Sequence, residues 1–266
     1  MEVFFIFNLK TNKMKKILLL LFTVIFISSL SAQDNNAWLQ TRVLNVDAND
    51  VEKFESAVAK KNQMYNSKDG TPRYFTFRIL TGQNSNQYLR AQYITSPEEL
   101  DNLDTEGNAY WQKTVSQYHT SEGGRVWGRS NNTSYYPESR ERTSLRRIIY
   151  YKYKDSGDND FWRFRWRVKN AMEESGYGSQ MSVFVCQSGC NGNVVQVRFH
   201  HDGWVGQTAD YGEPLQNMVN KYEEMYGENS YEQDSTKADE SLLPEGRIIR
   251  HHELLPNLSS PMRNNN

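Results

Sequence analysis

Residues 145–168 read LRRIIYYKYKDSGDNDFWRFRWRV, a β-rich run followed by a polar segment and then by aromatic residues mixed with arginines. The same order stands at residues 38–58, which read WLQTRVLNVDANDVEKFESAV. In both stretches, aspartates and asparagines that favour helix starts separate a strand-like run from apolar residues spaced three and four apart. Each stretch therefore predicts a strand that leads directly into a helix.

The aromatic run at residues 161–168 has two interpretations. Aromatic residues and arginines alternate there, which by period alone favours a strand with one arginine face. Phe161, Phe164 and Val168, however, repeat the helical spacing of the apolar residues that follow the first strand. We predict a helix whose arginines are solvated or pair with nearby acids; the alternative is an Arg/Trp face that binds an anionic sugar or a nucleic acid.

The elements that follow each stretch also match. After the first we expect a hairpin, a helix and a short strand, at residues 74–80, 88–94, 108–118 and 125–128. After the second we expect a hairpin, a helix, a polar loop and a final strand, at residues 181–185, 193–199, 213–226, 227–241 and 247–254. Matching elements lie roughly 105 to 110 residues apart, which indicates an internal duplication.

Two β-α-β-β-α-β units in one chain resemble the tandem form of the dimeric α+β barrel proteins. That group includes antibiotic-biosynthesis-monooxygenase-like, stress-responsive and haem-degrading members. The resemblance implies an α+β fold in which two ferredoxin-like βαββαβ repeats form an intramolecular α+β barrel or paired sheets. From the element order we place the repeats at residues 33–140 and 141–256, and we expect a disordered tail at 257–266.

The resemblance also suggests candidate catalytic residues. Haem-degrading members use an asparagine on the first strand, with a tryptophan and a histidine on or near the second helix, to hold the cofactor. Asn45, Trp111 and His119 stand in corresponding elements of this sequence. His119 has a structural alternative, because a histidine where a helix ends interacts favourably with the helix dipole.

The remaining histidines form two adjacent pairs on predicted strands: His200, His201, His251 and His252. Neighbouring residues of a strand point to opposite faces, so each pair sends one histidine to each side of the sheet. In a ferredoxin-like sheet the two strands would flank the central first strand of the repeat, which places same-face histidines about 10 Å apart at Cα. Two imidazoles could converge on a divalent metal, with Asp202 or Glu253 as a third ligand. The simpler interpretation is that histidines near strand ends meet polar loops.

Cys186 and Cys190 flank a Gly-containing turn within the second hairpin. In an oxidising compartment such a pair predicts a disulfide that fixes the turn. Free thiols and a chemical role are the alternatives, although a redox motif would have two intervening residues rather than three.

The beginning of the sequence has the order of a secretory signal. Lysines at positions 10, 13, 15 and 16 precede an apolar run over 17–27, and small residues follow up to Ala32. The run is shorter than the roughly 20 residues that a membrane span needs; the alternative is a retained anchor. We expect residues 1–32 to be a signal peptide, with Met14 as an alternative start, and the protein to be periplasmic or secreted in a bacterium.

Removal of residues 1–32 takes away four lysines and one glutamate, which leaves 27 basic and 31 acidic side chains. A nucleic-acid binder would show a basic excess or stripe, so we expect no nucleic-acid partner and no stable membrane span after cleavage. The sequence also lacks a serine nucleophile elbow, a phosphate-binding glycine loop and a metalloprotease helix.

From these features we expect an exported, noncatalytic protein, monomeric or homodimeric, without a cofactor. It would bind a small molecule or glycan in an aromatic cleft between the repeats, with Trp162, Trp166 and Trp204 as candidate ligand contacts. One alternative is a cofactor-independent oxygenase or a haem-binding enzyme of the barrel group. Another is an envelope interaction module that docks through residues 227–241 and 257–266.

Overall fold

The structure is a computed structural model that describes residues 37–95, 98–101, 104–137 and 143–261. The signal peptide expected at residues 1–32 lies outside the described residues. Within the described part, no helix has both the length and the apolar character needed to cross a membrane.

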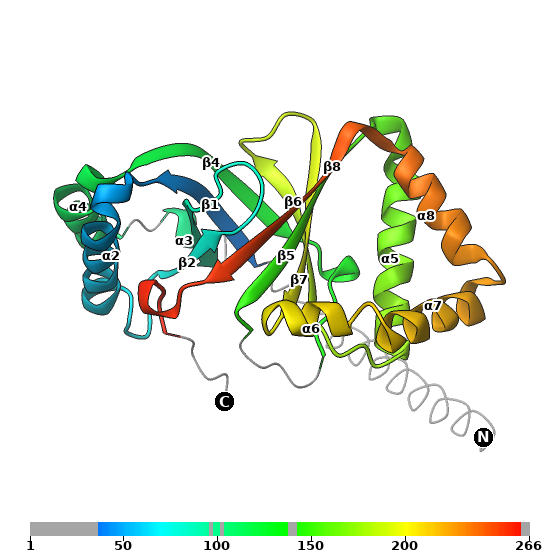
Figure 1. Cartoon of the computed structure of the whole chain (residues 1–266). Coiled ribbons are helices and arrows are strands. Elements are labelled where there is room, and N and C mark those ends of the chain that lie inside the picture. Colours follow the sequence, from blue (N-terminus) through cyan, green and yellow to red (C-terminus); the bar gives the residue numbers. More distant parts are fainter. Residues whose placement is uncertain (1–36, 96–97, 102–103, 138–142, 262–266) are drawn as a thin grey trace, which may run out of the picture. The chain divides into compact units, whose positions relative to one another are not determined.

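Eight strands of the described chain form a closed barrel in the order β1-β3-β2-β8-β5-β7-β6-β4, and every neighbouring pair is antiparallel (Figure 1). The strands are β1 (Trp38–Asn45), β2 (Arg73–Ile79), β3 (Tyr88–Ile94), β4 (Thr120–Arg129), β5 (Leu145–Tyr153), β6 (Met181–Ser188), β7 (Asn193–His201) and β8 (Leu242–Leu254). The barrel contains two four-stranded halves, β4-β1-β3-β2 and β8-β5-β7-β6, joined where β2 pairs with β8 and β4 with β6. The predicted α+β class is confirmed.

Helices cover the outer faces of both halves. They are α2 (Val51–Tyr65), α3 (Glu98–Asp101), α4 (Thr105–Thr114), α5 (Asp158–Glu174), α6 (Gly203–Ala209), α7 (Glu213–Tyr226) and α8 (Ser230–Glu240), with 3-10 turns η1 (Ala48–Asp50), η2 (Ser116–Tyr118), η3 (Asn131–Thr133), η4 (Asp155–Gly157) and η5 (Pro256–Leu258). In the first half, Phe54 and Val58 of α2 pack on Leu44 of β1 and Tyr88 of β3. In the second half, α5 packs against both α7 and α8 (Figure 1).

The contested aromatic run is helical, as predicted, because it lies inside α5. Its apolar residues Phe161, Phe164 and Val168 are buried in the core of the second half. Two of its arginines bind the buried carboxylate of Asp234 on α8: Arg163 Nε donates to Oδ1 at 3.1 Å, and Arg167 Nη1 donates to Oδ2 at 2.5 Å. These arginines therefore have a structural partner within the fold.

Several element boundaries differ from the prediction; strand β4, for example, begins at Thr120 rather than at residue 125. Residues 227–241, predicted as a polar loop, contain α8. The prediction missed this helix because its buried face is formed by Ser230, Asp234 and Ala238 and lacks an apolar stripe. Strand β8 begins at Leu242 rather than at residue 247. Helix α4 begins earlier than residue 108 because Asp104 caps it, accepting a hydrogen bond from Gly107 N–H.

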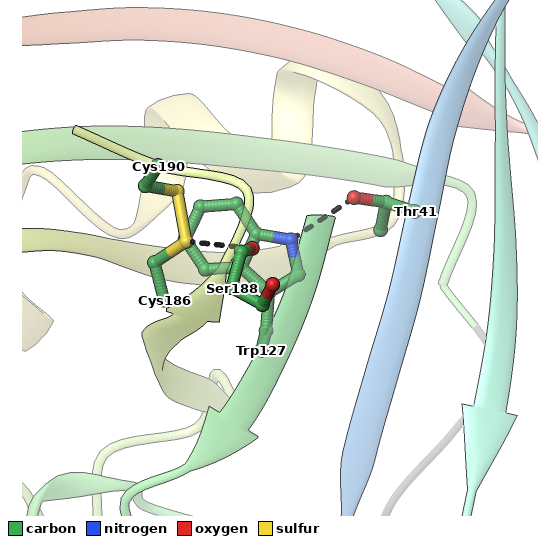
Figure 2. The surroundings of a disulfide bond; sticks show 5 residues. All are labelled: Thr41, Trp127, Cys186, Ser188 and Cys190. Carbon is green, nitrogen blue, oxygen red and sulfur yellow. Dashed lines mark hydrogen bonds between the residues drawn. A yellow bond between two sulfur atoms is a disulfide. The ribbon is translucent and has the colours of Figure 1, made fainter. Parts of the chain in front are cut away.

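The barrel interior holds a separate core around Trp127, whose Nε1 donates to Thr41 Oγ1 at 2.9 Å (Figure 2). The predicted disulfide between Cys186 and Cys190 is present and lies against this core. Sγ of Cys186 also lies 3.3 Å from the Ser188 carbonyl oxygen. The disulfide thus holds the turn between β6 and β7 beside the buried indole.

Residues that follow β8 return to the first half. Ser260 is fully buried, and its backbone and hydroxyl hydrogen-bond the backbone of Tyr74 in β2. Ser259 Oγ accepts from Thr76 N–H at 3.0 Å. This differs from the disordered tail expected at 257–266, because the two serines supply backbone partners to β2; residues 262–266 lie outside the described part.

Candidate functional site

A pocket of about 300 Å³ lies between the outer face of the first half and helices α2 and α4. It is lined by Arg42 on β1, Lys61 on α2, Tyr74 on β2, Arg90 on β3, and Asn108, Trp111 and Gln112 on α4. Arg42 and Arg90 are direct partners in the β1–β3 register, so both project from the same face of the sheet. The pocket therefore has a basic floor and a wall of polar and aromatic helix residues.

Arg90 is buried in the floor of this pocket, with 5% of its surface exposed. Its Nη1 donates to Thr76 Oγ1 at 2.6 Å and to the Leu258 carbonyl at 3.0 Å, and its Nη2 donates to Asn62 Oδ1 at 2.6 Å. All three acceptors are neutral. Burial lowers the pKa of Arg90 to about 9, and the guanidinium remains charged at neutral pH.

Lys61 is a second buried cation of the pocket. Its Nζ donates to Asn66 Oδ1 at 2.6 Å and to Asp104 Oδ2 at 3.2 Å, and it lies 4.5 Å from the centre of the Tyr74 ring. Burial and the neighbouring Arg90 charge lower the pKa of Lys61 to about 8, against the opposing effect of Asp104. Lys61 therefore gains or loses its charge close to physiological pH.

The charges of the described pocket do not balance. Arg42, Lys61 and Arg90 contribute three cations, and among the described residues Asp104 is the one carboxylate that forms an ion pair with any of them. A buried cation that lacks a counter-charge costs free energy, and an anion that enters the pocket reduces this cost. The arrangement favours a ligand with negative charge.

Aromatic rings stand beside these cations. The Arg90 guanidinium lies 4.8 Å from the centre of the Tyr74 ring and 5.1 Å from that of Trp111. Behind Trp111, the half-buried His119 ring packs between Trp111 and Phe54, at 5.4 and 5.8 Å between ring centres. The pocket thus offers ring faces on which a planar ligand could stack.

Comparison with known proteins adds information on the fold. No family model matches the chain, and no curated protein matches its sequence. A candidate monooxygenase from Fusobacterium nucleatum superposes with a TM-score of 0.58 at 10% identity, over 84% of this chain and 94% of that one. An anthrone oxidase-like protein gives 0.51 at 11% identity, over 84% and 93%. A variant of chlorite dismutase from Candidatus Nitrospira defluvii gives 0.52 at 9% identity, over 85% and 94%.

The chain has the dimeric α+β barrel fold. The predicted resemblance to that group is confirmed at the level of architecture. Sequence identities near 10% support the shared fold but no shared function.

The predicted trio of Asn45, Trp111 and His119 is only partly assembled in this barrel. Trp111 lines the pocket and His119 packs behind it. Asn45 instead lies at the exposed end of β1, where its Nδ2 donates to Glu122 Oε1 at 2.7 Å. The side chain of Asn45 is therefore engaged outside the pocket.

The described pocket residues do not fit haem. They include no histidine, cysteine or methionine that could serve as an axial ligand. Tyrosine can ligate haem as a phenolate, but burial raises the pKa of Tyr74, which disfavours that form. The nearby His119 does not line the pocket, and its ring packs between two aromatic side chains.

The other predicted binding residues are dispersed. Trp162 donates to Tyr153 Oη and Asp158 Oδ1 at 3.0 and 3.1 Å. Trp166 is half exposed on α5 beside Tyr226, and Trp204 lies on α6 against the His251 ring. Each tryptophan has a local partner of its own, and no common cleft is defined by their contacts.

The four strand histidines separate into inner and outer pairs, as alternation predicts. His201 and His251 face outward, where His201 Nδ1 lies 3.1 Å from Asp210 Oδ2 and His251 Nε2 lies 2.9 Å from Gln207 Oε1. His200 and His252 face the barrel interior. The described residues contain no group of three or more His, Cys, Asp or Glu side chains placed to hold a metal ion.

Sequence reasoning missed most of the pocket: Arg42, Lys61, Tyr74, Arg90, Asn108 and Gln112. One signal was available, because Arg90 shares a strand face with the apolar Tyr88, which the alternation places under a helix. A charged residue at such a position needs a partner or a ligand.

A substitution at Gly107 tests whether Asp104 packs closely against helix α4 while it binds Lys61. A Cβ at Gly107 would stand 2.2 Å from Asp104 Oδ2, the oxygen that receives Lys61. We expect Gly107→Ala to lower the free energy of unfolding by about 2 kcal/mol in urea titrations, although alanine ordinarily stabilises a helix by up to about 1 kcal/mol.

The matched control is Gly206→Ala in α6, where the added Cβ would meet His201 Cβ at an ordinary 3.9 Å. This variant should be at least as stable as the wild type. Equal behaviour of the two variants would contradict the packing described around Asp104.

Proposed function

We propose that this protein binds a small, planar organic anion in the pocket between α2, α4 and the first half of the barrel. The observation that carries the proposal is Arg90, a buried guanidinium whose three described acceptors are all neutral. Lys61 and Arg42 add positive charge, and Trp111 and Tyr74 add ring faces. The volume of about 300 Å³ lies at the lower end of the range for organic ligands.

We further infer that the two halves are duplicated ferredoxin-like repeats, because their strand orders correspond. In the second half, the space between sheet and helices is filled by a large apolar cluster that includes Ile149, Tyr151 and Met172. This supports a specialised first half that binds the ligand and a second half that completes the barrel. One chain supplies all eight described strands, so a monomer suffices for the site.

Replacement of Arg90 by an uncharged residue tests whether its charge holds the ligand. We expect Arg90→Met to weaken binding of 2-naphthoate, a planar carboxylate, by roughly 10- to 100-fold, because a charge-assisted hydrogen bond is lost. Fluorescence titration measures this. Binding of the neutral 2-naphthamide should change less than that of the carboxylate.

Arg78→Met is the matched control for this experiment. Arg78 lies on the neighbouring strand of the same sheet but pairs with Glu55 at 2.7 Å, outside the pocket lining. Its replacement should leave 2-naphthoate affinity unchanged. Equal loss in both variants, or equal affinity for the acid and the amide, would contradict the assignment of the pocket.

Affinity for an anionic ligand should depend on pH. Because the pKa of Lys61 is lowered to about 8, the pocket loses one cation as pH rises through that value. Affinity for 2-naphthoate, which stays ionised throughout, should therefore fall between pH 7 and 8.5, by at most about tenfold per pH unit. Lys61→Met should bind more weakly at pH 7 and show a flat profile; a sloping profile in that variant would exclude Lys61 as the titrating group.

A second candidate function is cofactor-independent oxygenation, favoured by the structural similarity to a candidate monooxygenase and an anthrone oxidase-like protein. An anthrone carries a ketone and an acidic methylene. Neutral Lys61 would accept the methylene proton, and Arg90 would stabilise the enolate oxygen that forms. Molecular oxygen would then oxidise the carbanion, so that the methylene becomes a carbonyl and one water is released for each O₂ consumed.

An oxygen electrode tests this candidate. With anthrone as substrate and no added metal, the protein should consume one O₂ for each quinone formed, and Arg90→Met should lower kcat/KM by roughly 100-fold. Absence of protein-dependent oxygen uptake would eliminate the oxygenase and leave the binding proposal to be decided by the naphthoate titration.

A further inference from the structure

The interior of the barrel is chemically divided. Much of its wall is apolar, formed by Leu39, Phe77, Ile79, Leu89, Ala91, Trp127, Phe184 and Leu254. Strands β5, β7 and β8 form another part, and their inward side chains are largely basic or polar. This second wall lies on the opposite face of the sheet from the helices and is separate from the pocket described above.

The strand register places five basic or imidazole side chains on this wall. Arg146 of β5 is paired with His200 of β7 on one side and with His252 of β8 on the other. Two residues further along β5, Ile148 is flanked in the same way by Arg198 and Arg250. Residues two apart share a strand face, so all five project to one side.

Contacts with interior aromatic rings show that this side is the inside of the barrel. The guanidinium of Arg146 lies 5.9 Å from the centre of the Phe77 ring, and that of Arg198 lies 5.3 Å from the Phe184 ring. Both phenylalanines belong to the interior core. His252 is paired with Ile79, another interior residue.

Several nitrogens of this wall are buried without an acceptor. Arg198 is 7% exposed; its Nε donates to Gln196 Oε1 at 2.9 Å, but its Nη2 has no hydrogen-bond partner in the described structure. Gln196 is fully buried and its Nε2 is likewise unpartnered. His252 is 1% exposed, and neither of its ring nitrogens has a partner there. Most of these unpartnered groups are hydrogen-bond donors, so a ligand that binds them must supply acceptors.

The charge of this wall is positive, which also favours an anionic ligand. No described carboxylate forms an ion pair with Arg198, Arg250 or His252. Burial, together with Arg198 and Arg250, lowers the pKa of His252 to about 3, and burial with Arg146 and Arg198 holds the pKa of His200 well below its usual value. Both imidazoles are therefore neutral, and a neutral imidazole can still donate one hydrogen bond.

This environment is unsuitable for the divalent metal that the histidine spacing suggested. His200 and His252 do share a face, but the Arg146 guanidinium stands between them in the register. A divalent cation there would be repelled by Arg146 and Arg198. An anion would be attracted by both.

We propose that the barrel interior contains a binding site for a small oxyanion, held by Arg198 with Gln196 and His252 as neutral donors. The ligand class is one that presents several oxygen acceptors in a small volume, such as phosphate or a small carboxylate. Its charge would offset that of the buried guanidinium, and its oxygens would satisfy the donors that the described protein leaves without acceptors.

Inorganic phosphate is the probe that tests the site, and thermal unfolding in increasing phosphate is the measurement. A ligand that binds the folded state raises the Tm with its concentration. We expect such a rise for the wild type and for Arg90→Met, which lacks the key cation of the outer pocket. Arg198→Met should abolish the phosphate-dependent rise in Tm, because it removes the charge that holds the anion.

His252→Gln and ¹⁵N spectra of the wild type keep the test decisive if Arg198→Met fails to fold. The glutamine variant should weaken phosphate binding at least fivefold, and phosphate should shift the His252 ring resonances of the wild type. A wild-type Tm and spectrum that ignore phosphate would overturn the proposal and indicate that water satisfies these donors. A response lost in Arg90→Met but kept in Arg198→Met would overturn it too, by assigning phosphate to the outer pocket.

Discussion

Backbone pairing of β2 with β8 and of β4 with β6 closes the barrel, and the other features of the structure depend on it. Without these two seams, each four-stranded half would leave two edges of unpaired N–H and C=O groups. The seams also bring interior side chains together, since Phe77 pairs with Leu254 at one of them and Trp127 with Cys186 at the other. Closure of the barrel therefore also brings residues of the interior core into contact.

Closure also separates two environments that share the same strands. On β1, Thr41 points inward to the Trp127 indole, whereas its neighbour Arg42 lines the outer pocket. On β7, Arg198 points inward, whereas Val197 is buried under the helices of the second half. A shift of the register by one residue would exchange these faces. The chemistry of both proposed sites thus rests on strand register as much as on residue type.

The sequence predicted the strands, the covering helices and the order in which they repeat, because these depend on local periodicity and caps. It failed at α8, whose buried face contains Asp234 and is stabilised by arginines of α5, a tertiary effect invisible to a local pattern. Alternation correctly separated inner from outer histidines. It could not show that Arg146 stands between His200 and His252, because that requires the pairing of three strands. Arg90 was missed for a similar reason, since its partners come from β2, α2 and the segment after β8.

The Leu258 carbonyl has a consequence for how the protein matures. It accepts hydrogen bonds from Asn62, Thr76 and Arg90, although it lies 168 residues beyond Arg90 in the chain. During synthesis, the strands and helices that surround the outer pocket leave the ribosome long before this oxygen does. A nascent chain that contains only the first half would expose Arg90 without one of its acceptors. The hydrogen-bond partners of Arg90 are thus complete only when nearly the whole described chain has been translated.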